Sequence, residues 1–244
     1  MTGFISIFVF QNCTLAQNAK DIVKKADEHA RGKTSMATMT IQTIRPKWSR
    51  EMTMKTWGKG NDLAMILVTA PVKDKGIVFL KRKKEVWNWI PSIERNIKMP
   101  PSMMSQSWMG TDFTNDDLVK EASILEDYEH SLLKDTVIDE RSCYKIHLQP
   151  KQQAAVIWGG IDLYIDKKTY IMIYGTYFDE DGKLVNTMHA SDIKNLGGRQ
   201  LPARLEMIPA DKKGHKTVLI YNSLTFDKAI DDAFFTSQNM NRLQ

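Results

Sequence analysis

Cysteine and long apolar segments are scarce in this sequence, and both shortages limit what the protein can be. Cys13 and Cys143 are the two cysteines among 244 residues. If an N-terminal leader is removed, Cys143 alone remains and no intramolecular disulfide can form. A packed core must then supply the stability. Beyond the N-terminus, no segment is apolar over the roughly 20 residues that a transmembrane helix needs.

Motifs for metal binding and catalysis are also missing. No nucleophile stands in a recognisable arrangement with a base. Asp179, Glu180 and Asp181 precede Gly182 and have the composition of a turn rather than of an acid–base pair. We expect no enzyme, no cofactor and no metal site, and a hydrolase is the alternative that these absences argue against. The histidines are scattered, without the spacing of metal ligands: His29, His130, His147, His189 and His215.

Positive charge is present but spread along the chain. The net charge is +5 and the sequence pI is about 9.0, which favours anionic neighbours such as lipid head groups. The charge is too diffuse to predict nucleic-acid binding. The longest basic cluster, residues 81–84 (KRKK), falls where we expect a solvated hairpin turn.

The N-terminus has the layout of an export signal. Residues 4–10 (FISIFVF) are apolar, and the small residues Thr14 and Ala16 suit a cleavage site. No lysine or arginine precedes the apolar run, so the natural start could lie upstream. Bulky and polar residues before Cys13 argue against a lipid attachment site. We interpret residues 1–17 as a signal peptide and residues 18–244 as a single domain.

Hydrophobic periodicity predicts a mainly β fold. A period of two recurs in short segments between turns, which indicates about ten to twelve antiparallel strands. A helix is expected at residues 21–32, and a second helix from an N-cap at Thr114 to about Ser123. One large antiparallel sheet must curl and bury its inner face, and these helical pieces are what the chain offers to cover it. The predicted strands end near residues 45, 55, 69, 82, 90, 137, 148, 165, 178, 193, 208 and 226.

An unusual stretch runs from Trp87 to Phe113. It holds three of the six tryptophans and four of the fourteen methionines. An aromatic strand ends at Pro91, and a Pro100-Pro101 break leads into an apolar segment rich in Met and Ser. Methionine is flexible and polarisable, so this composition is typical of an apolar flap that repacks around varied partners. Ordinary core packing is the alternative interpretation.

Five segments carry a resemblance to a known family. They are RPKWSR (45–50), PVKDKG (71–76), VWNWIP (86–91), PPSMMSQSWMGTDFTNDDLV (100–119) and DDAFFTSQNMNRL (231–243). With these in order, the chain resembles the LolA-like periplasmic carriers, in the branch of outer-membrane lipoprotein-sorting proteins. The resemblance extends from Ala26 to Leu243.

The resemblance implies an incomplete antiparallel β-barrel with a helical lid over a hydrophobic cavity. It further implies a monomeric periplasmic carrier of lipid or lipoprotein acyl chains, with an inner-membrane donor and an outer-membrane acceptor and no nucleic-acid partner. The expected cavity residues lie on the sheet: Met39, Ile41, Met52, Met54, Leu67, Phe79, Leu80, Trp87, Trp89 and Ile90. The expected lid residues are Met103, Met104, Trp108, Met109 and Phe113.

The sequence departs from the family at one position. The best-known members carry an Arg-Pro-Asn whose arginine helps to hold the lid shut. Residues 57–62 (WGKGND) stand in its place here and contain no arginine. Arg50, on a neighbouring strand and on the same face as Met52, is our candidate for a polar contact to the lid or to a head group. An envelope sensor or structural module of the same fold, its cavity filled by its own side chains, remains the alternative function.

Overall fold

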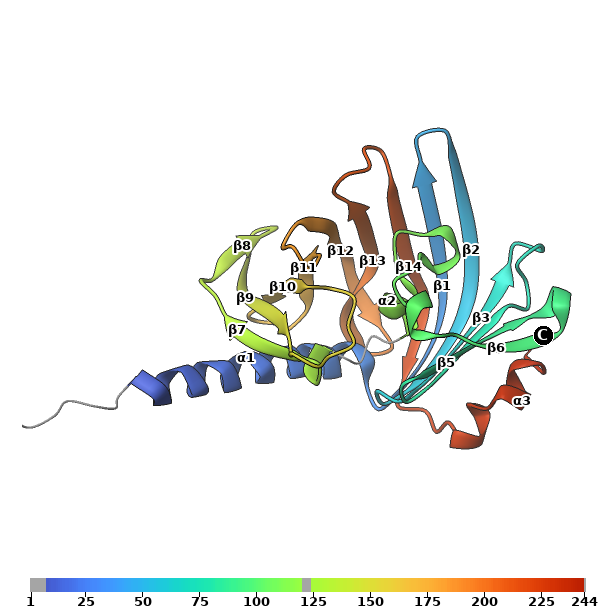
Figure 1. The fold of residues 1–244 in the computed structure, drawn as a ribbon, viewed down its shortest axis with the longest axis horizontal. Helices are drawn as coiled ribbons and strands as arrows, with labels where there is room; N and C mark the ends of the chain where they lie inside the picture. The colour runs from blue at the N-terminus through green and yellow to red at the C-terminus, as the bar shows by residue number, and fades with distance from the viewer. Residues whose placement is uncertain (1–7, 120–123, 244) are drawn as a thin grey trace, which may run out of the picture.

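A single antiparallel sheet dominates the computed structural model, which describes residues 8–119 and 124–243 (Figure 1). The sheet has 14 strands in the order β6-β5-β4-β3-β2-β1-β14-β13-β12-β11-β10-β9-β7, and β8 pairs with β9. The strands are β1 Thr34–Arg45, β2 Trp48–Lys59, β3 Leu63–Ala70, β4 Val78–Arg82, β5 Glu85–Ile90, β6 Arg95–Lys98, β7 Tyr128–Leu132, β8 Thr136–Ile138, β9 Arg141–Pro150, β10 Gly160–Asp166, β11 Met172–Phe178, β12 Leu184–Leu196, β13 Arg199–Pro209 and β14 Lys216–Phe226.

The sheet curls without closing, so the prediction of an incomplete barrel is confirmed. Its end strands, β6 and β7, do not pair with each other. The two halves of the chain join where β1 pairs with β14, with Ile44 opposite Lys216 and Ser35 opposite Phe226. The concave side, here the inner face, holds the largest buried cluster of apolar residues, and the convex side is the outer face.

Most strands lie where the periodicity predicts them. The count exceeds the predicted ten to twelve because of two local differences. The segment 128–137 is two strands, β7 and β8, and the short strand β6 follows β5. Each residue of β6 is exposed, so it has no buried alternation that a sequence pattern could reveal.

Helix α1 spans Phe8–Arg31 and is longer than the helix predicted at 21–32. Its apolar stripe, with Ile22, Val23 and Ala26, packs into the inner-face cluster, and the helix lies against β7 (Figure 1). Residues 1–7 of the predicted signal peptide lie outside the described residues, and cleavage stays a prediction. No helix among the described residues has the length and hydropathy to cross a membrane.

Helix α2 spans Asn115–Val119 and begins at the predicted N-cap. The Thr114 hydroxyl accepts a hydrogen bond from the Asp117 amide at 3.1 Å, and the Asp117 carboxylate accepts one from the Thr114 amide at 2.8 Å. This reciprocal pair is a capping box. The predicted end near Ser123 lies outside the described residues.

The C-terminal segment covers part of the outer face. A 3-10 turn at Asp232–Phe234 and helix α3 at Ser237–Met240 place Phe235 and Met240 against the outer side of β3–β5 (Figure 1). We call this group the outer cluster: Met65, Leu67, Val78, Leu80, Trp89, Phe235 and Met240.

Candidate functional site

A cavity of about 360 Å³ lies between the inner face, helix α1 and the segment that contains α2. A volume near 300 Å³ or more is within the range of small-molecule sites. The exposed lining residues Ala30, Gly60 and Asn61 place its opening between the end of α1 and the β2–β3 turn. Most of the wall is apolar and includes Val23, Ala26, Ala37, Met39, Met54, Ile66, Phe113, Leu118, Ile161, Leu163, Ile165, Met188, Met207 and Leu219.

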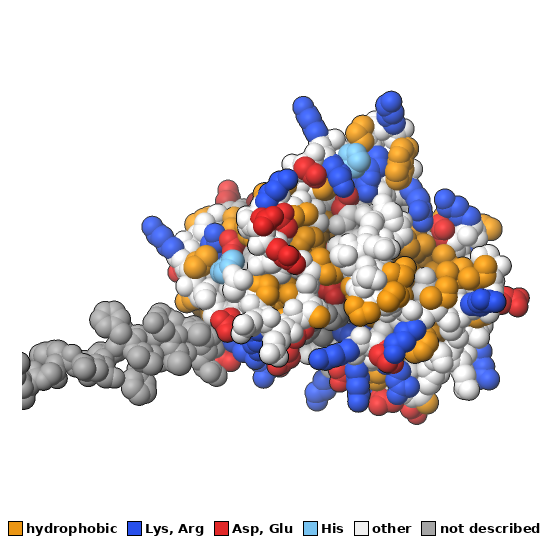
Figure 2. Space-filling model, in the orientation of Figure 1, with side chains coloured by type: hydrophobic (Ala, Val, Ile, Leu, Met, Phe, Trp, Pro, Cys, Tyr) orange, Lys and Arg blue, Asp and Glu red, His pale blue; other side chains and the backbone are white. Residues whose placement is uncertain are grey.

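Residues 101–119, here the lid, cross the inner face of the N-terminal half of the sheet. Trp108 is fully buried, and its ring lies 5.4 Å from that of Phe79 on β4. Phe113 is also buried and lines the cavity. Met103, Met104 and Met109 are only partly buried against the same cluster. In Figure 2, hydrophobic side chains gather over the lid and the neighbouring β5–β6 edge.

Hydrogen bonds also connect residues within the lid. The Trp108 amide donates to the Phe113 carbonyl at 2.8 Å, and the Thr111 hydroxyl donates to the Trp108 carbonyl at 2.8 Å. The Asn115 side-chain amide donates to the Met103 carbonyl at 2.8 Å. These internal bonds satisfy backbone groups that the sheet does not reach.

A buried ion pair ties the lid to the sheet. The Arg45 guanidinium meets the Asp112 carboxylate with two hydrogen bonds, of 2.9 and 3.1 Å, and also donates to the Gly110 carbonyl at 3.2 Å. The Thr217 hydroxyl on β14 donates to Asp112 at 2.7 Å and accepts from the Asp112 amide at 2.9 Å. We call Arg45, Asp112 and Thr217 the latch. A forked arginine–carboxylate pair of this kind fixes geometry as well as contributing energy.

Arg50, the predicted polar contact, lies beside the latch. Its guanidinium pairs with Asp74 at 2.9 Å and approaches the Met109 carbonyl at 3.4 Å. It therefore reaches the lid through one long hydrogen bond, whereas Arg45 makes three contacts to residues 110–112. Sequence reasoning missed Arg45 because its partner, Asp112, is distant in the chain and had no pattern of its own.

Two neighbouring carboxylates on α2, Asp116 and Asp117, introduce polarity into the cavity wall. Burial raises the pKa of Asp117, and this effect outweighs the hydrogen bonds from Thr114 and Trp158 that lower it. The Trp158 indole donates to Asp117 at 2.9 Å, and the Tyr128 hydroxyl donates to the Trp158 carbonyl at 3.2 Å. Thus α2 is attached through Asp117 to Trp158, in the loop that precedes β10.

The structure divides the predicted sheet residues between the two faces. Met39, Ile41, Met52, Met54 and Phe79 join the inner cluster, and Met39 and Met54 line the cavity itself. Leu67, Leu80, Trp87 and Trp89 pack instead with the outer cluster, away from the cavity. Ile90 is half-buried at the end of β5 and does not line the cavity.

The reason for this division is the two-residue period of a strand. Phe79 and Leu80 are adjacent, so they cannot face the same side. Strand β3 is buried on both faces, and Ile66 rather than Leu67 points inward. Because both of its faces are apolar, the sequence gives no signal that tells inner from outer.

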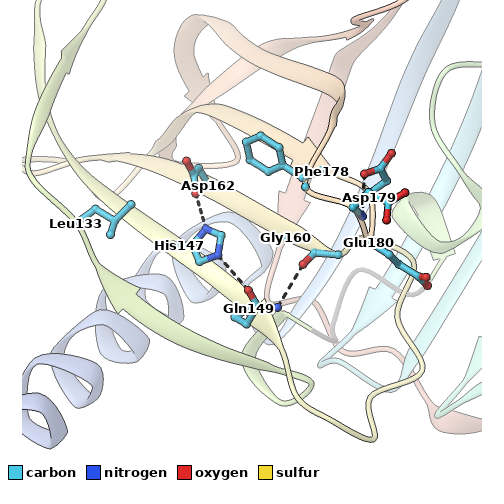
Figure 3. A pocket seen from close by; sticks show the side chains of 11 residues that line it. Leu133, His147, Gln149, Gly160, Asp162, Phe178, Asp179 and Glu180 are labelled. Atoms are coloured by element: carbon cyan, nitrogen blue, oxygen red, sulfur yellow. Dashed lines mark hydrogen bonds and ion pairs between the residues drawn. The ribbon is translucent and has the colours of Figure 1, made fainter.

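A second hollow, of about 470 Å³, lies on the other half of the molecule, and polar side chains are in the majority among its lining residues (Figure 3). His147 Nδ1 lies 2.7 Å from Asp162, whose other oxygen pairs with Lys145 at 3.0 Å. The loop 179–182 forms one rim. No nucleophile faces the imidazole among the residues that line this hollow. Across residues 8–119 and 124–243, no group of three or more ligating side chains is arranged for a metal ion.

Comparison with known proteins finds a family model and solved structures that are similar to this chain. A family model with the description "-like: Uncharacterized protein" matches residues 60–242. No curated protein matches the chain.

Solved structures share the fold. A DUF1329 family protein from Desulfovibrio piger has a TM-score of 0.85 and 18% identity, covering 93% of this chain and 99% of that chain. An outer membrane lipoprotein-sorting protein domain from Vibrio parahaemolyticus has a TM-score of 0.83 and 19% identity, covering 93% and 100%. A LolA superfamily protein from Nitrosomonas europaea has a TM-score of 0.78 and 23% identity, covering 90% and 98%.

Proposed function

The chain belongs to the family whose model matches residues 60–242 and has the LolA-like fold, and from this we propose that it is a periplasmic carrier of lipid or lipoprotein acyl chains. It binds the chains in the cavity under the lid and moves them toward the outer membrane. An inner-membrane donor loads it and an outer-membrane acceptor unloads it. The LolA-like fold is typical of carriers without enzymatic activity, and we propose no catalytic step.

The observation that carries this proposal is the apolar cavity of about 360 Å³ beneath a discrete lid. Each methylene group withheld from water contributes about 0.8 kcal/mol, so an apolar space of this kind favours a hydrocarbon chain over a polar ligand. The partly buried methionines at the lid can adjust to chains of different shape because their side chains are unbranched and flexible.

The latch explains how such a carrier could stay closed when empty. Opening the lid breaks the forked hydrogen bonds between Arg45 and Asp112, whose side chains are 10% and 7% exposed, and uncovers the apolar side chains of Trp108 and Phe113. Uncovering apolar surface costs energy, and a ligand that fills the cavity can offset that cost through burial of its own apolar surface.

Lipid binding tests the proposal directly. Native mass spectrometry of the purified protein should show co-purified amphiphiles, and a fluorescent fatty acid should bind to the delipidated protein. Ala37→Phe, on a buried β1 position that lines the cavity, should reduce fatty-acid affinity at least tenfold by occupying the space. The matched control is Ala229→Phe at an exposed position, which should leave affinity unchanged.

The same experiment separates the carrier from a sensor or structural module of this fold. A protein that binds no amphiphile, in either the co-purified or the delipidated form, would contradict the carrier function. Unchanged affinity in Ala37→Phe would show that the fatty acid binds outside the cavity.

A further inference from the structure

Two neighbouring hairpins extend past the rest of the sheet on the side of the latch (Figure 1). The β1–β2 hairpin turns at residues 45–48, and the β13–β14 hairpin turns at residues 209–216. Strand β3 pairs with β2 only from Thr53 onward, so Trp48 to Met52 have no β3 partner. A Cβ built at Gly214 would lie 3.3 Å from the Pro46 ring, which shows that the two turns touch. We call these two turns the tips.

The tips concentrate positive charge. Residues 45–48 and 209–216 contain five lysines and arginines and a single acidic residue, Asp211. Arg45 is held by Asp112 and Lys216 by Glu206, but Lys47, Lys212 and Lys213 are exposed. None of these three lysines makes an ion pair within the described part of the chain. In Figure 2 the basic side chains at the top of the view stand clear of the molecule's body.

An aromatic side chain completes this surface. Trp48 is 53% exposed, whereas the other tryptophans are buried or half-buried. The Arg45 guanidinium lies 5.8 Å from its ring centroid. Exposed tryptophan is costly in water but favoured at the boundary between lipid head groups and acyl chains. Lysines beside it would meet the phosphates of the same boundary.

We infer that the tips dock on an anionic lipid surface, with Trp48 entering the head-group layer and Lys47, Lys212 and Lys213 facing lipid phosphates. Charge complementarity identifies the occupant, because a cluster of unpaired lysines around one exposed tryptophan fits a bilayer interface better than an apolar protein groove. The inference does not rest on the carrier function, since a chain that binds no amphiphile could still dock in this way. Arg45, which contacts both Trp48 and Asp112, places the docked surface next to the lid.

Sedimentation with vesicles tests the inference. The protein should pellet with vesicles of equimolar phosphatidylcholine and phosphatidylglycerol, and not with pure phosphatidylcholine. Each lysine near an anionic surface contributes about a fivefold change in binding, so Lys47→Gln, Lys212→Gln and Lys213→Gln together should weaken binding about a hundredfold. These positions are exposed, and unchanged thermal unfolding will show that the variant folds.

The β4–β5 turn supplies a control with the same change of charge. Arg82, Lys83 and Lys84 are exposed at the opposite end of the strands, without an exposed tryptophan beside them. Replacing all three by glutamine should change vesicle binding by less than about fivefold. An equal loss in both triple variants would overturn the inference in favour of diffuse charge attraction.

Quenching by brominated phosphatidylglycerol tests the role of Trp48. Tryptophan emission of the wild-type protein should fall on mixing with these vesicles, and the quenched part should disappear in Trp48→Phe. Quenching that persists in Trp48→Phe, or a wild-type protein that fails to bind the anionic vesicles, would overturn the inference.

Discussion

The inner and outer faces of strands β3–β5 both carry buried apolar side chains but are covered in different ways. On the outer face, Leu67, Leu80 and Trp89 are closed over by Phe235 and Met240 from the C-terminal segment of the chain. On the inner face, Ile66 and Phe79 meet a lid that leaves a cavity of about 360 Å³ beside it. On the outer face the side chains form an ordinary packed core, whereas on the inner face a cavity remains.

This difference shows that the residues lining a cavity cannot be identified from residue type alone. Tryptophan, leucine and methionine occur in both the inner and the outer cluster, and what distinguishes the two clusters is how their covers are attached. Each cover inserts a fully buried ring, Phe235 on the outer side and Trp108 on the inner side. The inner cover is also fastened by the latch and by Asp117, and a cavity remains beside it.

Phe235→Ala should have the largest effect on stability, because Phe235 is completely buried in the outer cluster. Such truncations cost about 3–5 kcal/mol in the free energy of unfolding, measured by urea denaturation. Fatty-acid affinity of the folded protein should not change. The control, Ile97→Ala on exposed β6, should alter stability by less than about 0.5 kcal/mol. Loss of fatty-acid binding in Phe235→Ala would mean that the two faces are not independent.

Asp112→Ala should have the next largest effect, because it leaves Arg45 without its carboxylate in a mostly buried position. We expect a loss of up to about 3 kcal/mol and faster hydrogen exchange across residues 101–119. The control is Asp74→Ala, which removes the partner of Arg50. The Arg50–Asp74 pair is more exposed than the Arg45–Asp112 pair, so this change should cost about 1 kcal/mol or less. If both variants leave exchange in the lid unchanged, the latch does not hold the lid.

The smallest expected effect is a pH dependence at Asp117. Burial raises its pKa, so the folded protein holds this proton more tightly than the unfolded chain does. Its contribution to stability is therefore fully present below the ordinary aspartate pKa of about 3.9 and is lost as the pH rises through the raised value. The stability of the wild type relative to Asp117→Asn should thus fall as the pH increases. Urea denaturation across this pH range measures the difference, and a difference that rises with pH would contradict the assignment.

Much of the fold can be predicted from local chemistry. Period-two alternation in β1 and β2 predicts strands because Ile41, Met52 and Met54 must be buried while their neighbours need not be. The N-cap at Thr114 is predictable because a capping box is satisfied within four residues. The exposed strand β6 is not, since its pairing depends on β5 rather than on its own pattern.

The site is predictable only in part, because it depends on contacts between distant segments. The sequence indicates an apolar lid around Trp108 and Phe113, and both residues are buried beneath the sheet's inner face. The sequence does not indicate that Arg45 rather than Arg50 makes the main polar contact with the lid. Residues 45 and 112 are distant in the chain and meet only in the folded structure. The assignment of Leu67 and Trp89 to the outer face likewise requires the position of Phe235.

The pairing of β1 with β14 has a consequence for biosynthesis. The wall of the cavity is continuous only once the last strand of the chain has reached the first, across nearly the whole length of the sequence. Until then β1 and β13 are both open edges, to which another chain can add. Contacts between such distant residues form slowly. A growing chain therefore passes through an interval in which its apolar inner surface is divided between two halves and open to solvent.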